Sequence, residues 1–118
     1  MENKDLGKTS IGMEPNVAAL LSYSLGVITG IIFYLIEKDN KFVRFHAMQS
    51  IVVFGGLLVI NMVNSFMLGI LLPWQVRSAI SGIIGIVGLV LWIVLMIKAY
   101  QKDYFKLPFV GEIAEKNS

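Results

Sequence analysis

The sequence predicts an all-α integral membrane protein with three transmembrane helices. Of its 118 residues, 56% are hydrophobic, and three runs carry no formal charge: Pro15 to Ile36, Ala47 to Val76 and Ser78 to Ile97. A helix crosses the hydrocarbon core with about 20 mostly apolar residues, and lipid offers no hydrogen-bond partners to an open backbone. A soluble bundle would need polar helix faces, but the charges lie only between and outside the runs. We expect spans at 15–36, 47–72 and 78–97 within one membrane domain, residues 15–99.

Residues 1–14 mix glycine, serine, threonine and charges without periodicity, which is typical of a flexible N-terminal segment. In the first span, Ser22, Gly26 and Gly30 recur every four residues. A helix therefore places these small side chains on one ridge, where another helix can approach closely. We interpret the ridge as a helix-packing surface. Packing within the chain is favoured over a subunit interface.

The second span begins after a hydrophilic turn, Glu37 to Lys41, to which we assign no further role. Its thirty uncharged residues would make a helix about 45 Å long, more than a bilayer core requires. The helix must therefore tilt, break or begin at the surface, and we expect an interfacial helix at its start, near residues 42–50.

A polar stripe runs down one face of the second span, since a step of 3.6 residues joins His46, Gln49 and Ser50 to a second group of polar residues. Polar side chains at this depth must face protein or water. Interhelical hydrogen bonding is the favoured explanation, and a hydrated path is the alternative. The second group, an intramembrane polar face, comprises Asn61, Asn64 and Ser65.

In the third span, Gly82 and Gly85 belong to a second ridge of small residues, which we also interpret as helix packing. Residues 100–118 mix aromatic and basic side chains, which predicts an amphipathic tail at the membrane interface. Anchoring is the favoured role of this tail. The alternative is that it folds back against Arg44 and His46.

The charges predict the orientation of the chain in the cell membrane. With three spans, Lys4, Lys8 and Arg77 lie on one side and seven basic residues on the other. Because positive residues are retained in the cytoplasm, we expect the N-terminus outside and the first loop and the tail inside, near anionic lipid headgroups. The seven are Lys38, Lys41, Arg44, Lys98, Lys102, Lys106 and Lys116.

The inventory of reactive side chains disfavours an enzyme. The chain has one histidine and no cysteine, and all its carboxylates lie outside the apolar runs. We therefore predict no catalytic residues, no metal site and no cofactor. A net charge of +2 gives no reason to expect a nucleic-acid partner.

Arg44, His46, Gln49 and Ser50 form a polar motif at the predicted cytoplasmic end of the second span. For Arg44, headgroup contact is favoured over an internal hydrogen-bond network or substrate contact. For His46, we favour a packed neutral imidazole bonded to a neighbouring helix over a metal ligand.

The chain resembles the small Tic20-like membrane proteins of prokaryotes, which are related to MamF-like proteins. The resemblance lies in the order of its segments: a span, the Glu37–Lys41 turn, the Phe42–Ser50 stretch, two further spans and the Leu107–Ala114 segment. The resemblance covers about residues 14–116 and implies a multi-pass helical fold. Most prokaryotic members have no assigned activity. The superfamily is also related to a chloroplast inner-envelope import subunit, which belongs to a protein-conducting complex.

Two functions follow from these patterns. The favoured one is a membrane scaffold or accessory subunit that packs with partner helices, in a homo-oligomer or on another membrane protein, and binds anionic lipid. The alternative is an oligomeric channel or a protein-translocation component that uses the polar face of the second helix.

Overall fold

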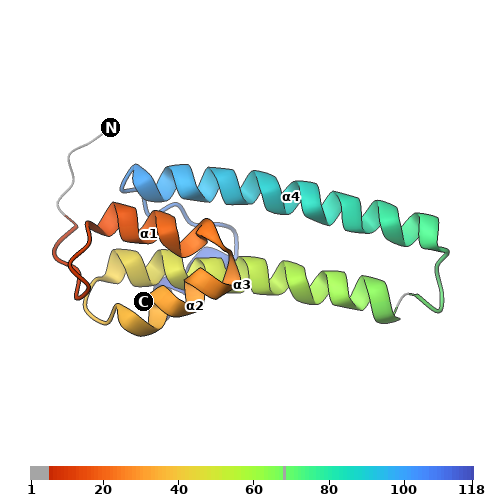
Figure 1. The fold of residues 1–118 in the computed structure, drawn as a ribbon, viewed down its shortest axis with the longest axis horizontal. Helices are drawn as coiled ribbons and strands as arrows, with labels where there is room; N and C mark the ends of the chain where they lie inside the picture. Colours follow the sequence, from red (N-terminus) through yellow and green to blue (C-terminus); the bar gives the residue numbers. More distant parts are fainter. Residues whose placement is uncertain (1–5, 68) are drawn as a thin grey trace.

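The computed structural model describes residues 6–67 and 69–118, and the regular elements of these residues are all helical. Figure 1 shows two long antiparallel helices with shorter helices gathered at one end. The elements are α1 (Pro15–Ser24), α2 (Val27–Ile36), α3 (Lys41–Met62), the π-helical turn η1 (Val63–Met67), α4 (Trp74–Tyr100) and α5 (Val110–Lys116).

Two helical segments are long and apolar enough to cross a membrane. The segment Lys41–Phe66 has 26 residues and contains an 18-residue stretch with a mean hydropathy of 1.7, and Trp74–Tyr100 has 27 residues and contains one with a mean hydropathy of 2.8. A 27-residue helix is about 40 Å long, so both exceed the hydrocarbon thickness. The predicted second and third spans thus correspond to α3 with η1 and to α4.

The first predicted span is not a single helix. The chain turns back between α1 and α2, which form a hairpin beside one half of the long pair (Figure 1). Each arm has 10 residues and is therefore about 15 Å long, half of what a span requires. The prediction of one helix over residues 15–36 is wrong at its centre, and the three-span architecture is not confirmed.

Gly26 and its neighbours explain the break between α1 and α2. Gly26 has φ +65° and ψ −126°, a conformation that strains any residue with a Cβ. The Thr29 hydroxyl accepts the N–H of Leu25 and donates to the carbonyl of Ser22, both at 3.0 Å. It thereby bridges the two helix ends across the turn, where the helical hydrogen bonds are interrupted. Ser22 and Gly26, which the sequence predicted to lie on a packing ridge, are therefore also part of a turn.

The N-terminal segment lies at the same end of the molecule as the loop between α2 and α3. The side-chain amide of Asn40 donates to the carbonyls of Leu6 (2.9 Å) and Lys8 (3.2 Å), and the N–H of Ser10 donates to the Glu37 carboxylate (2.9 Å). The predicted placement of this segment opposite the first loop is therefore wrong. Residues 6–10, expected to be flexible, are fastened, whereas residues 1–5 lie outside the described residues.

The start of α3 is packed inside the protein and does not lie at an interface as a separate helix. Asn40 caps α3 through its side-chain oxygen, which accepts the N–H of Val43 at 3.1 Å. Phe42, Val43 and Phe45 are buried within the first turns of one continuous helix. The expected interfacial helix is thus replaced by a buried helix end.

The tail returns across α3 after α4 ends, and α5 packs against α3. Residues 101–116 therefore fold back against α3, which was the alternative to a tail that lies along the membrane interface. It closes the core cluster at this end, whose buried members are Ala19, Tyr23, Phe42, Val53, Leu95 and Ala99.

Candidate functional site: a buried polar cluster beneath the tail

Three polar residues of α3 are fully buried, of which His46 and Gln49 bond to the tail and Ser50 to the α1–α2 turn. His46, Gln49 and Ser50 share one face because residues three and four apart are neighbours on a helix. Tyr23 of α1 is also fully buried and reaches the same place. Polar groups removed from water are costly unless they are paired, so each partner of this cluster matters.

The hydrogen bonds of the cluster determine the protonation of His46. Its Nε2 lies 2.8 Å from the carbonyl oxygen of Asp103, which can only accept, so Nε2 carries a proton. The Tyr23 hydroxyl accepts from the Gln49 amide (3.1 Å) and lies 2.6 Å from His46 Nδ1, to which it can give its own proton. The arrangement therefore fits a neutral imidazole that bridges α1 and the tail.

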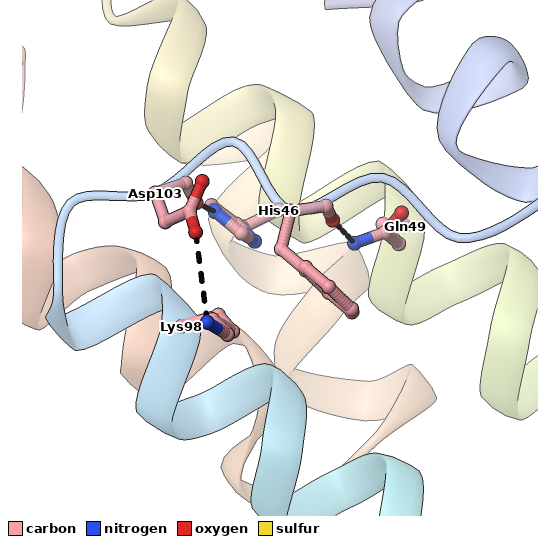
Figure 2. Close-up of polar contacts among 5 residues, drawn as sticks. His46, Gln49, Lys98 and Asp103 are labelled. Carbon is pink, nitrogen blue, oxygen red and sulfur yellow. Dashed lines mark hydrogen bonds and ion pairs between the residues drawn. The ribbon is translucent and has the colours of Figure 1, made fainter.

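Gln49 fastens the tail from both sides of its amide group. Its Nε2 donates to the carbonyl of Phe105 at 2.9 Å, and its Oε1 accepts the N–H of Leu107 at 3.2 Å. Figure 2 shows His46 and Gln49 both pointing at the loop segment of the tail, with the Lys98–Asp103 ion pair beside them. That pair is long, 3.9 Å, and half exposed, so it contributes little. The buried amide is the stronger attachment.

Further hydrogen bonds join the hairpin and α4 to this end. The Ser50 hydroxyl donates to the carbonyl of Gly26 (2.9 Å), where the helical ladder of α1 is interrupted. The Trp92 indole donates to the carbonyl of Tyr23 (2.8 Å), and the Asn16 amide donates to the carbonyl of Tyr100 (3.1 Å). Hydrogen bonds to backbone carbonyls thus attach the α1–α2 hairpin to both long helices.

Arg44 points at the end of α2 rather than away from the protein. Its Nη1 donates to the carbonyls of Tyr34 (3.0 Å) and Glu37 (2.8 Å), and its Nε donates to the backbone oxygen of Ser118 (3.1 Å). The guanidinium also lies 4.1 Å from the centroid of the Tyr34 ring. A cation favours helix-end carbonyls, so this geometry corresponds to the internal network, not to the favoured headgroup contact.

Glu37 organises the loop that was expected to be a plain turn. Its carboxylate accepts from the N–H and hydroxyl of Ser10 and from the N–H groups of Asp39 and Asn40, at 2.9 to 3.0 Å. Burial opposes ionisation, but these donors outweigh it, so the pKa of Glu37 lies below its ordinary value of 4.5. The negative charge holds the N-terminal segment in place.

Asn61, Asn64 and Ser65 lie at the opposite end of the long pair, next to the start of α4. The Ser81 hydroxyl donates to Asn61 Oδ1 at 2.6 Å, and Asn64 Nδ2 donates to the carbonyl of Arg77 at 3.0 Å. The carbonyl of Ser65 accepts from Arg77 Nη1 at 3.4 Å. The polar stripe therefore divides into two separate clusters, one at each end, and both bond to protein.

The small residues also divide into two groups. A Cβ on Gly30 would lie 3.0 Å from the Ala47 carbonyl, so Gly30 allows α2 to touch α3, and the Ser22 hydroxyl bonds within α1 to the carbonyl of Ala19 (2.6 Å). A Cβ on Gly82 or Gly85 would meet nothing within 4 Å. The first ridge packs inside the protein, and the second faces open space.

Chemically, the cluster beneath the tail is suited to fastening. Across residues 6–67 and 69–118, no group of three or more histidine, aspartate or glutamate side chains gathers. Sequence reasoning missed Tyr23 and Glu37, which are both fully buried. The only signal for Tyr23 was its position next to Ser22 in the sequence. Glu37 gave none, because the donors that bury it include Ser10, 27 residues away, besides its neighbours Asp39 and Asn40.

These features define a small helical protein in which a half-length hairpin and a returning tail are fastened to one end of a long helical pair. The chain belongs to the magnetosome magnetite crystal formation protein family, MamF/MmsF, which it matches over residues 9–114. The relation to MamF-like proteins predicted from the motif is thereby confirmed, whereas the wider Tic20-like resemblance stays a prediction.

Curated relatives place the chain among membrane proteins. It is 48% identical over 113 residues to a UPF0132 membrane protein of Methanocaldococcus jannaschii, covering 96% of each chain. It is 47% identical over 106 residues to one of Archaeoglobus fulgidus, covering 88% of this chain and 95% of that one. A second M. jannaschii relative is 39% identical, with 91% and 72% covered. No solved structure matches. The protein is therefore a helical membrane protein.

Proposed function

We propose that the protein is a membrane scaffold or accessory subunit whose uncovered helix surface packs with partner helices. The supporting observation is that the α1–α2 hairpin and the tail cover only one half of the long pair (Figure 1). On the other half, large apolar side chains of both long helices are exposed, and Gly82 and Gly85 leave open space beside α4. Small residues let a second helix approach closely in lipid. The exposed apolar residues include Leu58, Val59, Met62, Ile83 and Ile86.

The use of the polar stripe favours a scaffold over a channel. A water-filled path needs polar groups that face the path. Gln49, Asn61 and Asn64 instead make hydrogen bonds to the tail or to α4, as described above. Such bonds between membrane helices are worth about 1 kcal/mol or less each, and they explain the stripe without a path.

The fold also revises the orientation that we propose. The N-terminal segment, the first loop and the tail share one end, which carries eight of the nine described basic residues: Lys8, Lys38, Lys41, Arg44, Lys98, Lys102, Lys106 and Lys116. Only Arg77 of the nine lies at the other end. By the positive-inside rule the crowded end faces the cytoplasm, and its exposed lysines are suited to contact anionic headgroups.

The scaffold proposal is tested by Gly85→Leu, which fills the open ridge. The matched control is Ala79→Leu, an exposed position six residues earlier and therefore about 120° around the helix. We expect Gly85→Leu, but not Ala79→Leu, to lower the mass of the complex extracted from native membrane in mild detergent. If the Gly85→Leu protein is folded and the mass of its complex is unchanged, partner helices do not pack on this surface.

The channel alternative has its own test, because the chain has no native cysteine. We expect cysteines placed at Asn61 and Asn64 to resist water-soluble thiol reagents in permeabilised membranes, where the reagent reaches both sides, with Lys41→Cys as the exposed control. Rapid labelling of both asparagine positions would favour a hydrated path and count against the scaffold.

A further inference from the structure

A polar pocket of about 150 Å³ lies where the α3–α4 turn meets the start of α4. It is at the end opposite the tail and therefore separate from the cluster described above. The lining residues are Asn64, Ser65, Trp74, Arg77, Ser78 and Ser81.

Two buried polar groups of this pocket lack partners among the residues that the structure describes. Asn64 is only 2% exposed, and its Oδ1 accepts no hydrogen bond, although its Nδ2 is paired with the Arg77 carbonyl. The Nε of Arg77 is also buried without an acceptor. Unpaired buried polar atoms are rare because each costs free energy, so a ligand that supplies an acceptor to Arg77 and a donor to Asn64 would complement the pocket.

The charge of Arg77 has no counter-ion in the adjoining sequence. No aspartate or glutamate lies between Asp39 and Asp103, and both of these residues are at the other end of the molecule. The N-terminus of α4 lies at the same place and has no side-chain cap on its free N–H groups. A guanidinium and an open helix N-terminus both favour an anion, and a phosphate oxygen fits the planar fork of arginine.

The rim of the pocket indicates that the anion carries hydrocarbon. Trp74 lines the pocket, Phe66 follows the lining residue Ser65, and Leu71 lies in the turn between them; all three side chains are large and exposed. Tryptophan is enriched at the level of lipid headgroups. The pocket therefore opens where apolar side chains meet the headgroup level, so a phosphate bound in it can belong to a lipid whose chains contact these side chains.

We propose that this pocket binds the phosphodiester headgroup of a membrane lipid in the leaflet at the α3–α4 turn. Arg77 Nε and the N-terminus of α4 hold the phosphate. Asn64 Oδ1 accepts a hydrogen bond from a hydroxyl or ammonium group of the headgroup. The ligand is thus a phospholipid with a donor on its headgroup, such as a phosphoglycerol or phosphoethanolamine.

The test is a titration of the full, delipidated protein with phosphatidylglycerol, followed by native mass spectrometry. Arg77→Gln should weaken binding about tenfold or more, since it removes a charge-assisted contact. Ala79→Gln, at an exposed position of α4 that does not line the pocket, should leave that affinity unchanged. Phosphatidylcholine, which has no headgroup donor, and diacylglycerol, which has no phosphate, should both bind more weakly.

A second pair of variants tests the same pocket if Arg77→Gln does not fold. Ser78 is exposed and lines the pocket, so Ser78→Glu places a competing carboxylate beside Arg77, and Ser78→Gln is the neutral control. Ser78→Glu alone should weaken phosphatidylglycerol binding. Affinities within about threefold of the parent for both Arg77→Gln and Ser78→Glu would overturn the proposal. Displacement of the lipid by millimolar inorganic phosphate would overturn the lipid assignment.

Discussion

Replacing Gln49 by leucine should release the tail while the two long helices stay folded. Leucine nearly matches glutamine in volume, so the change tests hydrogen bonds rather than a cavity. It leaves the carbonyl of Phe105 and the N–H of Leu107 without their partner, and each unpaired buried group costs about 1–3 kcal/mol. The tail lies at an end of the molecule and can relax toward water, so we expect the lower bound, about 2 kcal/mol in total.

Hydrogen exchange of the tail amides in detergent or nanodiscs measures this cost directly. A loss of about 2 kcal/mol should accelerate exchange at Leu107 about thirtyfold, with little change in the centre of α4. The control is Gln75→Leu, the same substitution at an exposed glutamine of the opposite end. Unchanged exchange at Leu107, or equal acceleration in the control, would refute the role of the Gln49 amide.

Three further variants test the hairpin, the loop and the far cluster. Gly26→Ala should lower the thermal unfolding midpoint, since a positive φ costs a non-glycine residue about 1–3 kcal/mol. The control Gly56→Ala, in an open helical position, should leave the midpoint unchanged. Equal midpoints for the two variants would argue against a glycine-dependent turn at Gly26. Glu37→Gln should destabilise the protein at neutral pH. Because the pKa of Glu37 is lower in the folded than in the unfolded chain, the unfolded chain binds more protons. The carboxylate therefore contributes to folding stability above about pH 4.5, and this contribution is lost as the pH falls. If Glu37→Gln loses as much stability in acid as the parent does, this assignment is wrong. Ser81→Ala removes the hydrogen bond to Asn61 and should lower the unfolding free energy by about 1 kcal/mol or less. Ser78→Ala, at an exposed position, should leave it unchanged. A larger loss for Ser78→Ala than for Ser81→Ala would exclude an interhelical bond here.

Periodicity and charge placement predicted the parts of the fold that depend on one helix at a time. The uncharged runs identified α3 and α4, and the 3.6-residue step placed His46, Gln49 and Ser50 on one face. Interhelical hydrogen bonding was the favoured explanation of the stripe, and the bonds of Asn61 and Asn64 are of this kind. These features follow from local geometry and from the low dielectric of lipid, both of which are legible in a linear pattern.

The break at Gly26 shows where such patterns mislead. A small residue every four positions is equally consistent with a ridge on a straight helix and with a turn that needs glycine, because the same absence of a Cβ serves both. At the break, Thr29 pairs with the Leu25 N–H and the Ser22 carbonyl, and Ser50 of α3 donates to the Gly26 carbonyl. The contact with Ser50 comes from a distant helix, so it depends on the assembled fold.

The sequence by itself determined that this is a helical membrane protein, since uncharged runs of this length leave the backbone no other way to satisfy its hydrogen bonds in lipid. It also determined which residues are polar at depth. Tertiary structure alone decided that residues 15–36 turn back, that the N-terminal segment and tail share an end, and that Glu37 and Tyr23 are buried anchors. The physical reason is that each of these depends on pairing between groups far apart in the chain, which a local pattern does not encode.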